Sequence, residues 1–248
     1  MTSNPVAQDS EARPSGIHPG AAALPHEVHR RRPGTPGARL RRSWARPDGH
    51  VATELGQYST GVISDAMHRL GAMDGGIRAV WAGARLAGPA LTVWVRAGDN
   101  ARIHEAIALA EPGDVLVVNA QGAMTHAVFG ELMALACKAR GVAGIVVDGA
   151  IRDAAALFAT GFPVFARGAC ASGPLKEGTG EIGYPIAAGG VVCVSGDLVV
   201  ADADGVVVVP SADAVVVLER CREIDAWERQ CRADLSALPP MPLGADPA

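Results

Sequence analysis

The segment from Gly144 to Asp153, GIVVDGAIRD, carries the side chains of this chain that are best suited to chemistry. A short apolar strand is followed by a turn that is expected to present Asp148, Arg152 and Asp153 together. A carboxylate can ligate a hard divalent cation, and a neighbouring guanidinium can stabilise a developing oxyanion. The pattern predicts a site where an anionic substrate is held on a metal ion, although Asp148 could instead cap the end of the strand.

Two elements upstream are expected to position this site. Residues 113–118, GDVLVV, predict a buried strand, and ELMALACKARG predicts a helix that begins near Gly130. Parallel strands bind ligands at their carboxyl ends, and a helix N-terminus offers free N–H groups to a carboxylate. Glu131 in the first turn either complements the helix dipole or holds a metal or water near Arg152 and Asp153. The apolar positions at helical spacing are Leu132, Met133, Leu135 and Ala136.

The composition indicates one folded domain with a core of small and branched aliphatic side chains. The 248 residues are 49% hydrophobic but only 4% aromatic, and the net charge is −4. The mild acidity argues against a nucleic-acid-binding body, and no uninterrupted apolar run of about 18 residues predicts a membrane span. Five cysteines without a CxxC pair predict reduced, mostly buried thiols in a cytoplasmic protein, and no zinc site.

Several catalytic mechanisms find little support in the sequence. Lys138 and Lys176 are the only lysines, and neither lies in an apolar segment that would lower its pKa for Schiff-base chemistry. GxxxxGK[ST] and HExxH are absent. His104 and His126 remain candidates to line a substrate pocket, and Tyr184 is a candidate to set specificity together with them.

The chain divides into three predicted parts. Residues 1–45 are rich in proline and arginine and are expected to form a disordered extension. Residues 46–236 form a single domain that includes a helix capped by Ser59 or Thr60 and ends in a helix capped by Ser211. Residues 237–248 are an irregular tail. The short strands GGVVCV, DLVVAD and GVVVVP predict an antiparallel layer beside the first sheet, in which Asp202 and Asp204 shape the turn.

A set of segments, in order from residue 51 to residue 210, resembles a known family. They are GDNARIHEAIALAEPGDVLVVN, HAVFGELM, GVAGIVVDGAIRD, PVFARG, KEGTGEIGYPIAAGGVV and GDLVVADADGVVVVP. Together they are similar to the 4-hydroxy-4-methyl-2-oxoglutarate / 4-carboxy-4-hydroxy-2-oxoadipate aldolases, which share a fold with the regulator of ribonuclease activity A. The resemblance implies an α/β/β sandwich of that regulator's swivelling β/β/α type.

The resemblance also implies a role for each matching residue. Asp153 would ligate Mg²⁺ or Mn²⁺, Arg152 would contact the keto oxygen of the substrate, and Glu131 would hold a metal-bound water. The pyruvyl carboxylate would bind the backbone of Gly130, Glu131, Leu132 and Met133. The family forms trimers or hexamers of two trimers, and an acid from a neighbour's C-terminal helix often completes the site. Glu223 or Glu228 is the candidate here.

The implied activity is that of a class II, divalent-metal-dependent pyruvate aldolase. It would cleave a 4-hydroxy-2-oxo acid through a metal-stabilised pyruvate enolate, and would decarboxylate oxaloacetate as a side activity. Two positions depart from the family pattern: Ala156 stands where an acid is common, and Met133 stands where leucine is common. The alternatives are a non-catalytic protein that regulates a ribonuclease or helicase, and a related lyase that acts on another 2-oxo acid.

Overall fold

A computed structural model describes residues 33–238 of the chain. The helices are α1 (Gly49–Leu55), α2 (Thr60–Ala66), α3 (Ala101–Leu109), α4 (Glu131–Ala139), α5 (Ala154–Thr160) and α6 (Ala214–Ser236). The strands are β1 (Arg78–Ala79), β2 (Leu86–Val95), β3 (Val115–Asn119), β4 (Ala127–Phe129), β5 (Gly144–Ile151), β6 (Val164–Ala169), β7 (Gly180–Ile182), β8 (Ile186–Ala188), β9 (Val191–Cys193), β10 (Leu198–Asp202) and β11 (Gly205–Val209).

One mixed sheet dominates the fold and curves until it is nearly closed. Its strand order is β1-β6-β5-β3-β2-β10-β11, with β4 beside β5 and β7 beside β2. β2, β3, β5 and β6 are parallel, as expected for continuous apolar runs covered on both faces. The segment before β1 approaches the opposite edge, where Ala72 pairs with Val207 and the Met73 N–H donates to the Val206 carbonyl at 2.9 Å.

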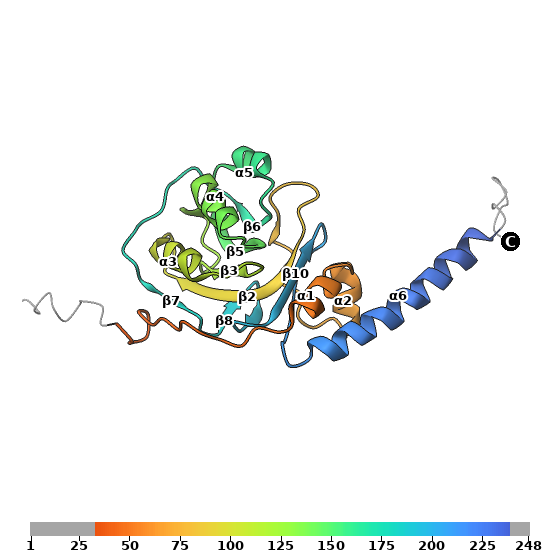
Figure 1. The fold of residues 1–248 in the computed structure, drawn as a ribbon. Helices are drawn as coiled ribbons and strands as arrows, with labels where there is room; N and C mark the ends of the chain where they lie inside the picture. Colours follow the sequence, from red (N-terminus) through yellow and green to blue (C-terminus); the bar gives the residue numbers. More distant parts are fainter. Residues whose placement is uncertain (1–32, 239–248) are drawn as a thin grey trace, which may run out of the picture.

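Helices cover two separate parts of this sheet (Figure 1). α3, α4 and α5 pack their apolar side chains on the outer face of the parallel strands. α1, α2 and the start of α6 pack on β10 and β11. The inner face forms a third core, to which Val115, Val146 and Phe165 contribute and which the β8–β9 hairpin helps to enclose. The predicted α/β/β class is confirmed, with a sheet that is nearly barrel-like.

The predicted antiparallel layer is only partly correct. β10 and β11 pair antiparallel from Leu198–Val209 to Asp202–Gly205, and the Asp204 N–H donates to Asp202 at the turn. They do not form a second sheet, however, because β10 also pairs with β2. β9 pairs with β8 instead, in a separate two-stranded hairpin. β2 lies far from β10 in sequence, so the spacing of the three short strands could not reveal the pairing between β2 and β10.

Part of the segment predicted as a disordered extension packs on the domain. Arg39 donates two hydrogen bonds to the Glu181 carboxylate, at 2.9 and 2.7 Å. Arg46, the residue that follows the predicted extension, does the same to Asp114, whose side chain is fully buried, with both distances 2.9 Å. Residues 33–45 therefore lie against the folded body, while the rest of the predicted extension, residues 1–32, lies outside the described residues.

The two predicted helix caps have different outcomes. The Ser59 hydroxyl accepts from the Val62 N–H at 3.2 Å, which confirms the cap of α2. α6 begins at Ala214, and its N-cap is Asp213 rather than Ser211. The Ser211 N–H instead donates to Asp197. Beyond its first turns α6 leaves the body of the domain (Figure 1), and Trp227 on it is 67% exposed.

The described cysteines fit the prediction of buried thiols. Cys137, Cys193 and Cys221 are buried, and all five are unpaired. Within residues 33–238 no helix has both the length and the apolar character needed to cross a membrane.

Candidate active site

Two adjacent strand ends bring the predicted site residues together. β4 runs parallel to β5, with Phe129 opposite Ile151, and the Arg152 N–H donates to the Phe129 carbonyl at 2.9 Å. Gly130 therefore follows β4 at the place where Arg152 follows β5. The short strand β4 had no sequence signal beyond the letters AVF. Its pairing with β5 places the α4 N-terminus beside the Arg152–Asp153 pair.

The approach of Asp153 to the α4 N-terminus requires a glycine at position 130. A Cβ atom on Gly130 would lie 2.6 Å from Asp153 Oδ2 and 3.2 Å from Arg152 Cγ. Asp153 Oδ2 accepts from the Glu131 N–H at 3.3 Å and lies 3.4 Å from Arg152 Nε. Asp153 itself has φ 61° and ψ 36°, a left-handed conformation that aspartate tolerates better than most residues. This arrangement fixes a carboxylate and a guanidinium beside free helix N–H groups.

A cavity of about 170 Å³ opens in front of these residues. Its walls come from five places: β4, the α4 N-terminus, the junction between β5 and α5, the start of α3 and the loop before β7. The predicted residues Gly130, Leu132, Met133, Arg152 and Asp153 all line it. The other lining residues are Asn100, His104, Ala127, Val128, Phe129, Pro174 and Lys176.

Asn100 contributes a buried polar group to the cavity wall. It is only 4% exposed, and its side-chain amide contacts the Met133 sulfur at 3.5 Å. The Asn100 side-chain oxygen has no hydrogen-bond partner within the described part of the chain. An unpaired buried oxygen is unfavourable by about 1–3 kcal/mol, so Asn100 is a polar residue of this wall whose oxygen the described protein does not satisfy.

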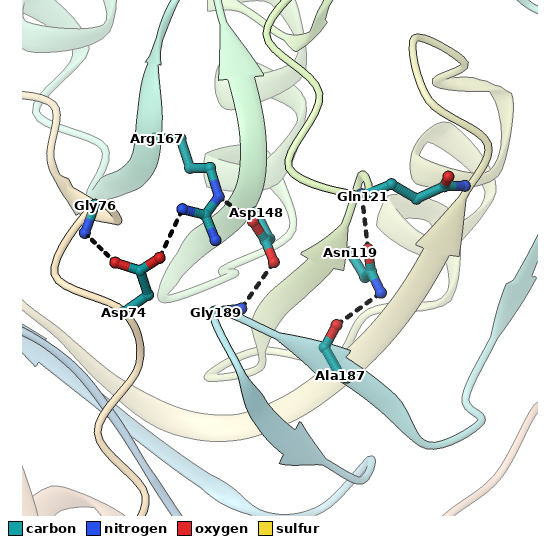
Figure 2. Close-up of polar contacts among 8 residues, drawn as sticks. All are labelled: Asp74, Gly76, Asn119, Gln121, Asp148, Arg167, Ala187 and Gly189. Carbon is teal, nitrogen blue, oxygen red and sulfur yellow. Dashed lines mark hydrogen bonds and ion pairs between the residues drawn. The ribbon is translucent and has the colours of Figure 1, made fainter.

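Asp148 does not belong to this site, contrary to the sequence prediction. β5 continues past it to Ile151, because β4 extends the pairing, so Asp148 lies inside the strand and is 7% exposed. It accepts hydrogen bonds from Arg167 Nε and from the Gly189 N–H (Figure 2). Arg167 also reaches Asp74 at 3.0 Å. Asp148 therefore anchors the β8–β9 hairpin and the Asp74 loop, and cannot act with Arg152.

The electrostatics of this anchor are consistent with a structural role. Hydrogen bonds to Asp148 and Asp74 raise the pKa of Arg167, while the Gly76 N–H and Arg167 lower the pKa of Asp74. The neighbouring Asn119 amide donates to the Ala187 carbonyl at 2.6 Å, on the same hairpin (Figure 2). The cluster thus fastens the hairpin to the end of β3 and to the interior of β5.

The remaining candidates divide between the cavity and other surfaces. The Glu131 side chain is half-buried and is not part of the cavity wall, although its N–H contacts Asp153. Neither His126 nor Tyr184 lines the cavity. His126 contacts Thr125, and the Arg39 guanidinium lies 4.3 Å from the centre of the Tyr184 ring. His104 does line it. Leu132 and Leu135, expected on an apolar face, are 78% and 46% exposed, whereas Met133 is buried.

Two lining residues escaped the sequence reasoning. Asn100 precedes α3 and could have been read only as a helix cap, a role its side chain does not take. Lys176 was considered solely as a Schiff-base lysine. Its place at the cavity depends on loop contacts with residues about 76 positions earlier, such as the hydrogen bond from Asn100 N–H to the Leu175 carbonyl.

The cavity offers few side-chain ligands for a divalent metal ion. Within residues 33–238 no cluster of three His, Cys, Asp or Glu side chains is placed to hold a metal. Mg²⁺ nevertheless needs only one or two protein carboxylates, because water and substrate oxygens complete its octahedral shell. Asp153 is 39% exposed at the cavity edge and supplies such a carboxylate. The residues present therefore fit a cation that is held jointly by Asp153, water and a substrate.

This fold agrees with comparisons to known proteins. The family model RraA-like, described as Aldolase/RraA, matches residues 60–208, which is more than half of the chain. The chain belongs to this family. A protein of Halalkalibacterium halodurans named "Putative 4-hydroxy-4-methyl-2-oxoglutarate aldolase" is 41% identical over 174 residues, 70% of this chain and 83% of that protein.

Solved structures give the same family. RraAS2 of Streptomyces coelicolor, described as an unusual member of the RNase ES inhibitor RraA protein family, is 34% identical with a TM-score of 0.70. The match covers 77% of this chain and 99% of that one. The RNA-processing inhibitor RraA from Thermus thermophilis is 31% identical with a TM-score of 0.58, over 62% and 93% of the two chains.

Proposed function

We propose that this protein is a carbon–carbon lyase that cleaves a 4-hydroxy-2-oxo acid, such as 4-hydroxy-4-methyl-2-oxoglutarate or 4-carboxy-4-hydroxy-2-oxoadipate, to release pyruvate. The observation that carries the proposal is the juxtaposition of the Arg152–Asp153 pair with the α4 N-terminus at one cavity. A helix N-terminus favours a carboxylate, and an adjacent guanidinium favours a developing oxyanion. The names of the aldolase relatives support the same reaction class.

The binding roles follow from the positions of the chain's own groups. The first N–H groups of α4, from Gly130 to Met133, receive the substrate C1 carboxylate. Arg152 then faces the C2 oxygen, and Asp153 holds the cation site next to it. A divalent cation at Asp153, Mg²⁺ or Mn²⁺, would supply Lewis-acid polarisation of the 2-oxo group.

Cleavage requires one proton to leave and one to return. A water oriented by Glu131 removes the 4-hydroxyl proton, and the O–H electron pair becomes the new carbonyl bond at C4. The C3–C4 bond breaks, and its electron pair passes to C3 and the C2 oxygen, where Arg152 stabilises the negative charge. Protonation of C3 gives pyruvate, and the other product is an oxo compound. Oxaloacetate would lose CO₂ through the same enolate, which makes its decarboxylation the expected side activity.

The oligomeric state is also part of the proposal. The cavity is open to solvent, and the large apolar side chains of Leu132, Leu135 and Trp227 are exposed on the described surface. Burial of such side chains between copies of the chain would be favourable. We infer a homotrimer or a hexamer, in which Glu223 or Glu228 of α6 approaches a neighbouring copy's cavity.

The test is pyruvate release measured with lactate dehydrogenase and NADH. The purified chain is assayed with 4-hydroxy-4-methyl-2-oxoglutarate and with oxaloacetate, first with MgCl₂ and then with excess EDTA. Turnover that EDTA abolishes and fresh Mg²⁺ restores supports the proposal. A folded protein that releases no pyruvate from either substrate with Mg²⁺ or Mn²⁺ contradicts it.

The solved neighbours favour a second candidate, a non-catalytic regulator of RNA processing. Two of them are described as members of ribonuclease-inhibitor or RNA-processing-inhibitor families. The close approach of Asp153 to Gly130 and the unpaired oxygen of Asn100 favour the lyase, because a protein that only binds a partner requires neither feature. A stable complex with a purified ribonuclease or helicase, together with no metal-stimulated turnover, would favour this candidate over the lyase.

A further inference from the structure

We propose that residues 37–46, called the strap below, hold in place the cavity wall formed by the loop before β7, and that Arg39 and Glu181 are positioning residues for substrate binding. The effect on substrate binding rests on the proposed function, although the contact itself lies outside the cavity. The strap precedes residues 60–208, which the family model matches. In Figure 1 it runs from β7 to the start of α1.

The strap adds a short parallel strand to one edge of β7. The other edge of β7 pairs antiparallel with β2. Leu40 forms a parallel bridge with Ile182, whose N–H donates to the Arg39 carbonyl at 3.1 Å. A second backbone hydrogen bond runs from the Gly180 N–H to the Gly37 carbonyl at 2.9 Å. Since a bare edge would leave these backbone groups to water, the strap completes the pairing of β7.

The ion pair between Arg39 and Glu181 fixes the position of this added strand. The Arg39 guanidinium binds both carboxylate oxygens of Glu181, and the Gly37 N–H donates to the same carboxylate at 2.6 Å. The Glu181 side chain is only 14% exposed. The hydrogen bonds from Arg39 lower the pKa of Glu181 more than partial burial raises it, so the carboxylate is ionised at neutral pH. Loss of Arg39 would therefore leave a mostly buried charge without its counter-ion, which is unfavourable.

The strap has separate anchors beyond this ion pair. Leu40 and Trp44 pack against the core that lies under α3 and α4. Arg46 pairs with Glu111 at 3.2 Å as well as with Asp114, in the turn after α3. A substitution of Arg39 should therefore loosen the β7 end of the strap while the Arg46 end stays attached.

The loop that β7 follows forms part of the cavity wall. Pro174 and Lys176 of this loop line the cavity, and only three residues separate Lys176 from Gly180, the first residue of β7. On its other side the loop is held by α3, where Arg102 Nε donates to the Gly178 carbonyl at 3.1 Å. The loop thus has two supports, α3 and the β7 strand that the strap completes.

A wall that loses one of its two supports should bind substrate less tightly without changing the chemistry. Arg152 and Asp153 follow β5 and form a different part of the wall. Apparent affinity falls in proportion to the fraction of molecules in which the binding conformation is present. If the loop stays in place in about one variant molecule in five, KM rises about fivefold, and kcat is retained because the bound molecules have the loop in place.

The test uses the full chain and two independent readouts. The variants are Arg39→Met, Glu181→Gln and the double variant, with Arg42→Met as the matched control, because Arg42 is an exposed arginine of the same strap. Amide hydrogen exchange of the peptide that covers residues 170–180 is measured by mass spectrometry. KM and kcat are measured for oxaloacetate with MgCl₂.

Each single variant should accelerate exchange in residues 170–180, leave exchange in α4 unchanged, and raise KM about fivefold with kcat within about twofold of the wild type. The double variant should add little to either single variant, because both break the same contact. Arg42→Met should change neither readout, and Arg39→Lys should restore part of the wild-type KM.

Unchanged exchange in residues 170–180 of folded Arg39→Met would overturn the inference, and so would faster exchange with an unchanged KM. A wild type that releases no pyruvate would contradict the lyase proposal instead. The exchange measurement would then decide by itself whether the strap holds the loop, because it does not depend on turnover.

Discussion

Substitution of Gly130 by alanine tests the site geometry without removing a catalytic group. The added Cβ would lie 2.6 Å from Asp153 Oδ2, whereas ordinary van der Waals contact begins at 3.4 Å. The carboxylate must therefore retreat by about 0.8 Å, and Arg152 Cγ, which the new Cβ would approach to 3.2 Å, must also shift. A misplacement of about 1 Å at a reacting centre lowers rates about 10²-fold, so kcat/KM should fall by roughly that factor, or about 2.7 kcal/mol.

The same substitution should leave the fold largely intact. Gly130 has φ −162° and ψ −172°, an extended conformation that alanine adopts without strain. Alanine is a poorer N-cap than glycine, so the free energy of unfolding should fall by only about 1 kcal/mol.

The assay is pyruvate release at several substrate concentrations, with thermal unfolding recorded in parallel. Gly49→Ala is the matched control, because a Cβ there meets nothing within 4 Å. If Gly130→Ala retained wild-type kcat/KM while folded, the argument that this close approach positions Asp153 would be refuted.

Three further predictions concern the fold. Arg46→Ala should lower the free energy of unfolding by about 3 kcal/mol in urea titrations, because it leaves the fully buried Asp114 carboxylate without its ion-pair partner. An effect no larger than that of the exposed Arg42→Ala substitution would contradict the packing of this segment. Burial raises the pKa of Asp202, but hydrogen bonds from Thr60 lower it more, to below its usual value. The ionised carboxylate therefore stabilises the fold above about pH 4, and the stability advantage over Asp202→Asn should shrink as the pH falls below that value; an advantage unchanged from pH 6 to pH 3 would count against this. Iodoacetamide at pH 8, followed by mass spectrometry, should modify the two partly exposed thiols first. Burial raises the pKa of the Cys137 thiol to about 12 and that of the Cys221 thiol to about 11, which keeps them unreactive. Rapid labelling of the three buried thiols would show that they are more accessible than they are in the structure. The fast thiols are Cys170 and Cys231, and the slow ones are Cys137, Cys193 and Cys221.

The features that local pattern encodes were predicted well. Continuous apolar runs correctly predicted β3 and the start of β5, and the predicted Ser59 cap is present. The Arg152–Asp153 pair was also placed at the correct strand end. These features depend on residues within a few positions of each other, which is why the sequence contains enough information to locate them.

The features that were missed depend on distant partners. Asp148 resembled a strand end because a charge follows three apolar residues, but Arg167 and Gly189 allow it to be buried within β5. Arg39 lies in a segment whose composition indicates disorder, yet it is ordered by Glu181, 142 residues away. Lys176 reaches the cavity through the docking of its loop on α3. In each case a long-range contact overrides a correct local expectation.

The central claim is that Arg152 stabilises an enolate of pyruvate, and hydrogen exchange tests it without any need for the physiological substrate. The methyl protons of pyruvate are followed by proton NMR in D₂O with the full chain and MgCl₂. The wild type should exchange them, and Arg152→Gln should slow the exchange about 10²- to 10³-fold, as for loss of an oxyanion-stabilising donor, while exposed Arg78→Gln should not. Exchange at the wild-type rate in a folded Arg152→Gln variant, or no exchange by the wild type at all, would contradict the account.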